Sequence, residues 1–337
     1  MHTAKYYNKL ENRAVECVLC PHHCKIPPDA LGTCGVRKNV DGELKALGYG
    51  RLSAIHSDPI EKKPLYHFYP GSVILSLGGY GCNMRCSFCQ NCDISQVRLV
   101  DYQNYRYYSP EAIVDNAIAN NKNLGFAYTY NEPSIWYEYM YDLSLKAVEQ
   151  RLKNIMITNG YIEEEPLTDI LPFMDAFNVD LKAFTNSFYQ KTTGSSLYPV
   201  QKALELIRNS GKHLEITNLV IPGMNDSTGE FKRMITWIAE NLGNHTVLHL
   251  SRYFPRHRLD KESTSPAKLQ EFYELASTKL QYVYLGNISL DKGRDTYCHN
   301  CGTKLIQRNG YSTEILPTLI NQHCTNCQTN IPVTMEA

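Results

Sequence analysis

Twelve cysteines fall into three tight groups of four along this chain of 337 residues. The groups lie at 17–34, 82–92 and 298–327, and scattered core thiols would not gather in this way. The first residues lack the apolar core of a secretion signal, and no stretch approaches the ~20 apolar residues of a membrane span. Disulfides are rare in such a setting, so the cysteines predict metal binding in a cytoplasmic protein.

The charge composition gives no indication of a polyanionic partner. Lys plus Arg and Asp plus Glu number 34 each, so no overall basic field would attract nucleic acid or an anionic membrane. With 43% hydrophobic residues, the chain is suited to one large domain, or to one large domain with small attachments.

Between residues 73 and 290, apolar β-rich runs alternate with longer helical patterns. Candidate strands are Val73–Tyr80, Leu124–Tyr130, Asn154–Thr158, Ala176–Leu181, His213–Ile221 and His245–Ser251. Candidate helices are Ser109–Asn120, Ser134–Gln150, Leu197–Asn209, Ser227–Asn241 and Ser265–Thr278. The alternation is typical of parallel β/α units in an open sheet or a barrel, and six units are too few for a closed eightfold barrel. We therefore expect an α/β fold with a partial (β/α)6 barrel over 73–290, flanked by Cys-rich appendages at 1–72 and 291–337.

A loop after the first candidate strand carries Cys82, Cys86 and Cys89 in the spacing C-x3-C-x2-C. A fully ligated 4Fe–4S cluster takes four thiolates, so three leave one iron open. An open coordination position is characteristic of a catalytic metal site. Cys92 offers an alternative, because as a fourth ligand it would close the cluster into a simple electron-transfer centre.

With Phe88 just before its third cysteine, this loop resembles the signature of the radical S-adenosylmethionine (SAM) superfamily. The resemblance implies a 4Fe–4S cluster on Cys82, Cys86 and Cys89, whose open iron binds SAM and whose electron cleaves SAM to a 5′-deoxyadenosyl radical. Similar proteins carry an aromatic residue at the place of Cys92, which favours a bystander role for that thiol.

Polar motifs follow the next candidate strands, where parallel β/α folds gather their reactive residues. They resemble the SAM-binding elements of glycyl-radical activating enzymes, with Tyr130 and Asn131 in place of two glycines before Glu132. The resemblance implies these cofactor-binding residues: Tyr130, Asn131, Glu132, Thr158, Asn159, Asp180, Lys182, Val220 and Pro222. Asp180 and Lys182 share a face of their strand end, so they can hydrogen-bond the ribose and pair with the methionyl carboxylate.

Each of these motifs also has a purely structural interpretation. Glu132 could be a carboxylate favoured at a helix N-terminus, and Asp180 with Lys182 a surface ion pair. The Pro222 turn could be ordinary turn chemistry. The order of the matches, together with the cysteine loop, favours the SAM site over these alternatives.

The last four cysteines form two C-x2-C knuckles separated by 22 residues that contain Asn309-Gly310. They are Cys298, Cys301, Cys324 and Cys327. Two knuckles joined by a hairpin are typical of a zinc ribbon or a rubredoxin-like site. We expect zinc rather than iron, in a closed site that stabilises folding and takes no part in catalysis.

The first four cysteines, Cys17, Cys20, Cys24 and Cys34, have a less regular spacing. They could hold structural zinc, hold a second Fe–S cluster that relays electrons, or remain free thiols, and His22 or His23 could replace one ligand. We favour zinc, because four-thiolate zinc sites are common and the spacing matches no known two-cluster ferredoxin pattern.

The segments 17–37 (CVLCPHHC…GTCGVR), 58–69 (DPIEKKPLYHFY) and 82–96, with the C-terminal knuckles, resemble one group in particular. It is the AmmeMemoRadiSam-system radical SAM enzyme, a relative of pyruvate formate-lyase activating enzyme. The resemblance implies Memo-type and AMMECR-type companions and a flavodoxin or ferredoxin as electron donor, but no substrate. A glycyl-radical-enzyme activase is one alternative. The other is a non-catalytic Fe–S or zinc protein that binds a partner, with Cys92 closing the cluster.

Overall fold

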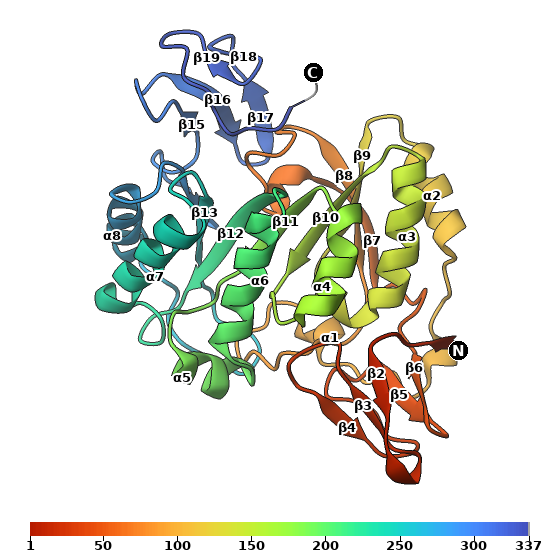
Figure 1. Ribbon diagram of the computed structural model, residues 1–337. Coiled ribbons are helices and arrows are strands. Elements are labelled where there is room, and N and C mark those ends of the chain that lie inside the picture. The colour runs from red at the N-terminus through yellow and green to blue at the C-terminus, as the bar shows by residue number, and fades with distance from the viewer. Residues whose placement is uncertain (336–337) are drawn as a thin grey trace.

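One eight-stranded sheet organises the computed structural model of this chain, which describes residues 1–335 (Figure 1). Its strand order is β14-β13-β12-β11-β10-β9-β8-β7. The strands are β7 (Ala54–Pro59), β8 (Val73–Gly78), β9 (Asn123–Tyr128), β10 (Lys153–Thr158), β11 (Ala176–Asp180), β12 (His213–Val220), β13 (Val247–Arg252) and β14 (Val283–Gly286). Strands β8 to β14 are parallel, and β7 pairs antiparallel with β8 at one edge.

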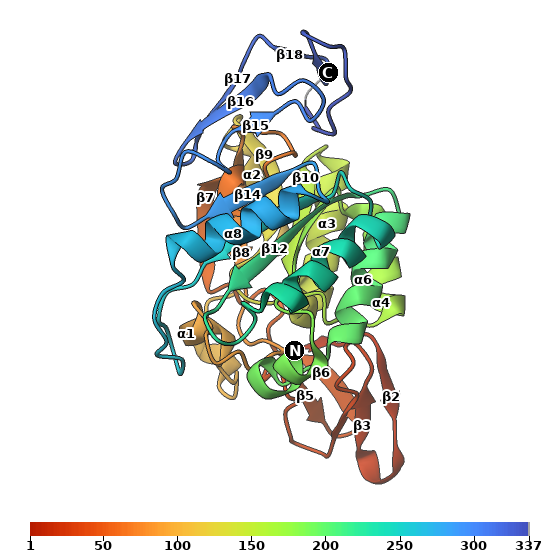
Figure 2. The ribbon, with the colours of Figure 1, turned by 90° about the vertical axis from the view of Figure 1, so that its left-hand side faces the viewer.

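The helices that connect the parallel strands pack along one face of this sheet (Figures 1 and 2). They are α2 (Pro110–Ile118), α3 (Tyr137–Glu149), α4 (Glu164–Ile170), α6 (Leu197–Asn209), α7 (Thr228–Asn241) and α8 (Pro266–Ser277). Two shorter helices, α1 (Cys92–Ser95) and α5 (Asn186–Phe188), lie in the loops that follow β8 and β11. Among residues 1–335, no helix combines the length and the apolar character that a bilayer crossing would require.

Local sequence explains these elements well. Helix α2 begins at Pro110, and the Ser109 side chain accepts a hydrogen bond from the Ala112 N–H, as expected of an N-cap residue. The consecutive residues Ile155 and Met156 of β10 are both fully buried, because a central parallel strand is covered on both faces.

All six expected strands are present, each within a few residues of its expected bounds. The expected barrel size of six strands is too small, because β14 adds a seventh parallel strand beside β13. Strand β7, which falls within the expected N-terminal appendage of 1–72, belongs to the central sheet. The structure is thus a mixed α/β fold around a large parallel sheet.

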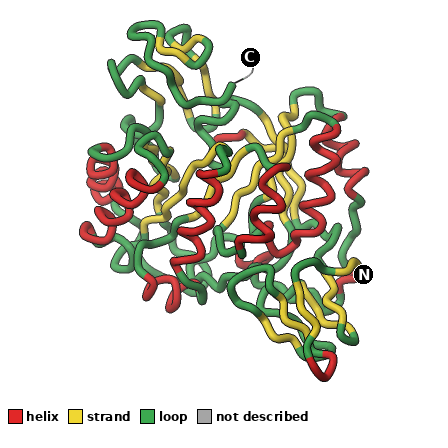
Figure 3. Tube along the Cα trace, viewed as in Figure 1, coloured by secondary structure: helices red, strands yellow, loops and turns green. Residues whose placement is uncertain are grey.

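The two cysteine-rich ends of the chain lie at opposite ends of the sheet (Figures 1 and 2). The N-terminal strands are β1 (His2–Thr3), β2 (Tyr7–Lys9), β3 (Val15–Cys17), β4 (Cys24–Ile26), β5 (Arg37–Val40) and β6 (Glu43–Ala46), in sheets ordered β1-β6-β5 and β2-β3-β4. The C-terminal strands are β15 (Thr296–Tyr297), β16 (Lys304–Asn309), β17 (Ser312–Ile315), β18 (Leu319–Ile320) and β19 (His323–Cys324). Figure 3 shows both regions as strands and loops, with the longer helices confined to the centre.

The C-terminal strands pack against the amino ends of the sheet strands, which we call the amino edge. The fully buried Arg308 donates a hydrogen bond from Nη2 to the Tyr66 carbonyl at 2.8 Å. The Tyr284 hydroxyl of β14 hydrogen-bonds His67 at 2.6 Å and Thr296 at 2.7 Å. The N-terminal strands lie at the other end, the carboxyl edge, where the loops after the parallel strands gather.

Candidate active site at the carboxyl edge of the sheet

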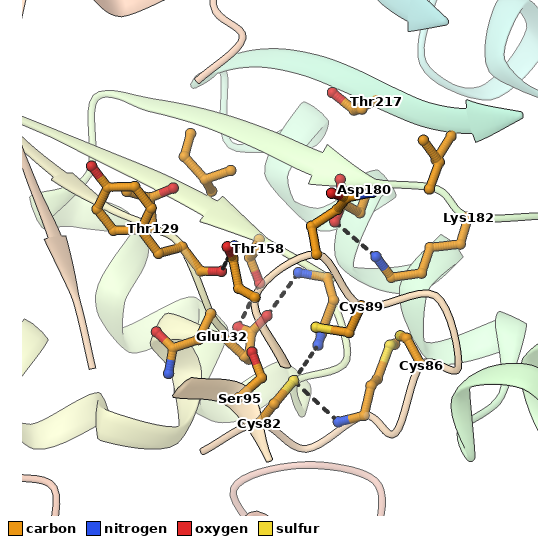
Figure 4. A pocket seen from close by; sticks show the side chains of 18 of the residues that line it. Cys82, Cys86, Cys89, Ser95, Thr129, Glu132, Thr158, Asp180, Lys182 and Thr217 are labelled. Carbon is orange, nitrogen blue, oxygen red and sulfur yellow. Dashed lines mark hydrogen bonds and ion pairs between the residues drawn. The ribbon is translucent and has the colours of Figure 1, made fainter. Parts of the chain in front are cut away.

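A cavity of about 580 Å³ opens at the carboxyl edge of the sheet (Figure 4). Ten of the twelve residues expected from sequence at a cluster and cofactor site line it. They are Cys82, Cys86, Cys89, Tyr130, Asn131, Glu132, Thr158, Asn159, Asp180 and Lys182. Val220 and Pro222 are absent from this lining. Successive strand ends therefore bring together residues that are up to about 100 positions apart in the sequence.

The cysteine loop follows β8 and is held in place by backbone contacts. The Arg85 N–H donates to the Thr193 carbonyl at 2.7 Å, and the Ser87 N–H donates to the Thr192 carbonyl at 3.1 Å. Gly81 has a φ of +79°, and a Cβ at this position would lie 2.4 Å from the Cys34 carbonyl oxygen. Only glycine fits there, so the loop presses directly against the N-terminal strands.

Two thiols of this loop, those of Cys82 and Cys86, have raised pKa values and are poor acids without a bound cation. Burial raises the pKa of Cys86 to about 11, although Lys182 opposes the rise. Burial and the nearby Glu132 carboxylate raise the pKa of Cys82 well above its usual value. Thiolates at these positions therefore need a metal to compensate their charge, and the chemistry of the three sulfurs fits an iron–sulfur cluster.

Glu132 connects the ends of two neighbouring strands. It is 1% exposed, and its Oε1 accepts hydrogen bonds from the Ser134 N–H at 3.0 Å and from Thr158 Oγ1 at 2.7 Å. Its Oε2 accepts from the Asn159 N–H at 2.7 Å. Burial raises the pKa of Glu132, and these hydrogen bonds oppose the rise. The carboxylate holds the walls of the cavity together and leaves one lone pair of Oε2 for a ligand.

Tyr130 and Asn131, in place of the two glycines of the resembled motif, have structural roles. Tyr130 adopts a φ of +68°, the left-handed conformation that glycine prefers, and its hydroxyl donates to Asp58 at 2.6 Å. Asn131 accepts from the Gly79 N–H at 3.1 Å and donates to the Gly81 carbonyl at 2.8 Å. The backbone bend of a glycine is thus retained, and the Asn131 amide fastens the start of the cysteine loop.

Asp180 and Lys182 form the expected pair on one strand end, with Nζ and Oδ2 2.8 Å apart (Figure 4). Burial alone would lower the pKa of Lys182, but Asp180 and Cys86 outweigh it and raise that pKa. Lys182 is therefore a permanent cation beside the cysteine loop, suited to a carboxylate or another anionic group.

Cys92 starts helix α1 and does not line the cavity. The only close partner of its sulfur within residues 1–335 is Asp93 Oδ1, at 3.7 Å. Of the four cysteines at 82–92, three therefore line the cavity and Cys92 does not.

Several lining residues were missed from sequence: Lys63, Thr129, Thr217, Leu219, Ser251 and Asn287. On β12, Thr217 and Leu219 line the cavity, whereas Val220 is fully buried outside this lining. Side chains alternate along a strand, so residues 217 and 219 lie on the face opposite to 218 and 220. This alternation could have indicated Thr217 and Leu219, but the prediction relied on the turn motif that contains Pro222. Lys63 is held by Asp58 at 2.7 Å, and burial lowers its pKa to about 8.

The C-terminal knuckles form a separate metal centre at the amino edge. Cys298, Cys301, Cys324 and Cys327 bring all four sulfurs within 4.8 Å of one another. Two pairs are closer still: Cys298 and Cys327 at 3.5 Å, and Cys301 and Cys324 at 3.6 Å. Four thiolates at 2.3 Å from one tetrahedral ion lie about 3.8 Å apart, so this group fits a single metal ion.

The cavity residues belong to a segment that matches a known family. A family model described as the radical SAM superfamily matches residues 77–237. The Methanocaldococcus jannaschii protein MJ0808 is 40% identical over 338 residues, covering 99% of this chain and all of that protein. A second M. jannaschii protein, MJ0103, is 29% identical over 231 residues, covering 59% of this chain and 52% of that protein.

Two solved structures are also similar in shape. A domain of pyruvate-formate lyase-activating enzyme from Bacteroides vulgatus has a TM-score of 0.44 at 15% identity, covering 48% of this chain and 99% of that chain. A radical SAM methyltransferase from Sphaerobacter thermophilus has a TM-score of 0.49 at 14% identity, covering 65% of this chain and 67% of that chain.

Proposed function

Since the chain belongs to the radical SAM superfamily and is thus an enzyme that cleaves SAM at a 4Fe–4S cluster, we propose that Cys82, Cys86 and Cys89 hold that cluster. The observation that carries this proposal is their common exposure to the cavity of about 580 Å³ at the carboxyl edge. Cys92 lies outside the lining, which leaves one iron open for a ligand and disfavours a closed electron-transfer centre.

SAM occupies the remainder of this cavity in our proposal. Lys182 pairs with the methionyl carboxylate, and Asp180 accepts hydrogen bonds from the ribose hydroxyls. Glu132 provides negative charge near the amino group, while its bonds to Thr158 and Asn159 keep the strand ends in register. Bound together, the cluster and SAM supply a 5′-deoxyadenosyl radical that removes hydrogen from an unactivated C–H bond.

A second cavity of about 350 Å³ adjoins the first and is a candidate place for the substrate. The two share Lys62, Thr217, Ser251 and Asn287 in their walls. The turn between β16 and β17, with Asn309 and Tyr311, also lines the second cavity. The C-terminal unit therefore helps to enclose the open side of the sheet, next to the proposed SAM site.

At the amino edge we propose structural zinc in a ribbon-like unit over 291–337, of which residues 291–335 are described. The sulfur separations of 3.5 and 3.6 Å support a single tetrahedral ion. Hydrogen bonding with Thr303 and Asn326 holds the pKa of Cys301 below its usual value, which favours the thiolate that zinc binds.

We further propose that the chain is an AmmeMemoRadiSam-system enzyme with Memo-type and AMMECR-type companions and a flavodoxin or ferredoxin as reductant. The segments 17–37 and 58–69 support this proposal, because both border the active site. Asp58 from the second segment accepts a hydrogen bond from the Tyr130 hydroxyl and pairs with Lys63, and Lys63 lines the cavity.

Anaerobic turnover with dithionite and SAM tests the assignment of the cluster ligands. The Cys86→Ala variant is expected to lose 5′-deoxyadenosine formation, whereas Cys92→Ala, the matched control, keeps it. Electron paramagnetic resonance gives a second readout, because SAM perturbs the reduced cluster only if one iron is open. Retained turnover in Cys86→Ala, or a spectrum unchanged by SAM, would refute the proposal.

A further inference from the structure

The N-terminal cysteines meet around one small cavity. Cys17 on β3 lies opposite Cys24 on β4 in the antiparallel register, and Cys20 and Cys34 come from the turns after β3 and before β5. All four line the same cavity, and three of them, Cys17, Cys20 and Cys34, are at most 8% exposed. Four thiols around one enclosed space form a ligand set.

The separation of these sulfurs differs from that in the C-terminal quartet. Within residues 1–335, no three of the N-terminal sulfurs lie within 4.8 Å of one another. A single tetrahedral zinc ion would need them about 3.8 Å apart. A 4Fe–4S cluster spreads its ligands, because each thiolate binds a different iron. The sulfurs of Cys82, Cys86 and Cys89 likewise do not all lie within 4.8 Å of one another.

A buried arginine beside the cavity offers a hydrogen-bond donor to a bound cluster. Arg37 lines the cavity and is 1% exposed. Two of its nitrogens bind Glu138, at 2.8 and 3.2 Å, and one of these also donates to the Lys5 carbonyl at 2.6 Å. Its Nε is buried and has no hydrogen-bond partner in the described part of the chain. A buried, unused donor is costly, and a thiolate-ligated cluster would give it a partner.

This quartet lies directly against the loop that we assign to the catalytic cluster. The Cys34 carbonyl oxygen lies so close to Gly81, the neighbour of Cys82, that a Cβ on this glycine would be 2.4 Å away. Arg85 donates hydrogen bonds to the Thr33 carbonyl and to the Cys82 carbonyl. The His22 ring donates to the Asn83 carbonyl at 2.6 Å. The contacts between the N-terminal quartet and the cysteine loop therefore lie directly beside Cys34 of the quartet and Cys82 of the loop.

We propose that Cys17, Cys20, Cys24 and Cys34 hold a second 4Fe–4S cluster that relays electrons to the catalytic cluster. The relay role rests on the proposed function of the loop. One electron enters from a low-potential protein donor of the ferredoxin or flavodoxin class and reduces the N-terminal cluster. The same electron then passes to the loop cluster, so the N-terminal cluster is reoxidised and no bond in the chain forms or breaks. Cys24, the partly exposed ligand, lies on the side that a donor can approach.

Metal analysis of a variant without the catalytic cluster tests the presence of the second one. The triple variant Cys82→Ala/Cys86→Ala/Cys89→Ala leaves the quartet intact and, after anaerobic reconstitution, is expected to retain about four irons per chain with a 4Fe–4S Mössbauer spectrum. Zinc is expected to stay at one per chain, from the C-terminal site. A second zinc without iron, or neither metal in the quartet, would overturn the cluster.

Comparison of two reductants tests the relay. In Cys20→Ser/Cys34→Ser, cleavage of SAM driven by dithionite is expected to persist, whereas cleavage driven by reduced flavodoxin falls at least tenfold, with Cys92→Ser as the control. The relay would be refuted if SAM cleavage fell equally with dithionite and with flavodoxin, or if flavodoxin-driven cleavage did not fall. If this variant does not fold, freeze-quench spectra of the wild type decide, because the N-terminal cluster must be reduced before the loop cluster. Failure of the proposed function itself would instead appear as dithionite-driven turnover in Cys86→Ala.

Discussion

The two ends of the central sheet carry the same kind of residue in opposite arrangements. At the amino edge, four cysteines bring all their sulfurs within 4.8 Å of one another, remote from the catalytic loop. At the carboxyl edge, the cysteines of the loop and of the N-terminal quartet face cavities, and within residues 1–335 no three sulfurs of either group lie within 4.8 Å of one another. Close sulfurs suit one ion that stabilises a fold, whereas spread sulfurs suit a cluster that exchanges electrons or binds a ligand.

The difference follows from the role of each edge in a parallel sheet. Loops after the strands converge at the carboxyl edge, so they can surround a cofactor with residues from many strands. At the amino edge, short loops lead from each helix to the next strand, and this edge provides a surface against which another unit can pack. Here it binds the C-terminal unit through a buried network that includes Arg308, His67 and Glu215.

The largest expected effect is the loss of the metal at the amino edge, which should leave the carboxyl edge folded. Cys301→Ser is expected to remove one zinc per chain and to destabilise the C-terminal unit by on the order of several kcal/mol, because structural zinc contributes folding free energy. Formation of 5′-deoxyadenosine should fall less than in Cys86→Ala, since the residues assigned to the cluster and to SAM lie outside the C-terminal unit. Zinc analysis and limited proteolysis of residues 291–335 check this. Unchanged zinc and unchanged protection would contradict a structural site.

Two ion pairs at opposite ends of neighbouring strands provide the next comparison. Lys182 pairs with Asp180 at 2.8 Å at the carboxyl edge, and Lys153 pairs with Asp175 at 3.1 Å at the amino edge. Lys182→Met is expected to raise the Kd for SAM about 10- to 100-fold, the equivalent of a charge-assisted hydrogen bond of about 1.5–3 kcal/mol. Lys153→Met should leave this Kd unchanged. Equilibrium titration of the anaerobic protein with SAM measures both, and equal effects would contradict the assignment of the SAM site.

Acid is expected to weaken the amino edge. Burial lowers the pKa of His67 to about 3, so the unfolded chain binds its proton first and stability falls as the pH drops from about 6.5. Burial alone would raise the pKa of Glu215, but hydrogen bonds from His213 and His249 hold it well below its usual value, and its contribution is lost as the pH falls through that low value.

Urea unfolding at pH 7, 6 and 5 measures this loss of folding stability. Uptake of one proton on unfolding corresponds to a slope of about 1.4 kcal/mol per pH unit. The His67→Gln variant should show a shallower dependence on pH, whereas His257→Gln, at an exposed position, should behave as the wild type. Equal slopes in all three proteins would exclude His67 as the source.

The smallest expected effect compares two asparagines of similar exposure. Asn131 binds the backbone of Gly79 and Gly81 at the carboxyl edge, and Asn123 binds Leu75 and Ala117 at the other. Each alanine variant is expected to lose about 1–2 kcal/mol of stability, the value of two hydrogen bonds. Only Asn131→Ala should also lower iron retention, because it loosens the cysteine loop. Thermal melting and iron analysis check both variants, and equal iron retention would argue against this role of Asn131.

Much of the central fold was predictable from patterns within short segments. The six expected strands are present because alternation of apolar runs and helical periods is a local property. Strand β7 escaped prediction because an edge strand can be polar and can end in proline, as Pro59 does here. Helix α4 spans only Glu164–Ile170 and contains Pro166. It is too short to show a helical periodicity in the sequence, so it was not predicted.

By itself, the sequence determined the chemistry: which thiols can ligate metal, and the order of polar motifs after successive strands. Spacing of a few residues constrains a loop or a knuckle directly, so Cys82, Cys86 and Cys89 could be recognised as one group. Only the tertiary structure decided the distances between remote segments. Packing placed Cys34 against Gly81, sent Thr217 rather than Val220 into the cavity, and drew one quartet together while leaving the other spread. These distances arise from the packing of whole strands and sheets, which no short stretch of sequence contains.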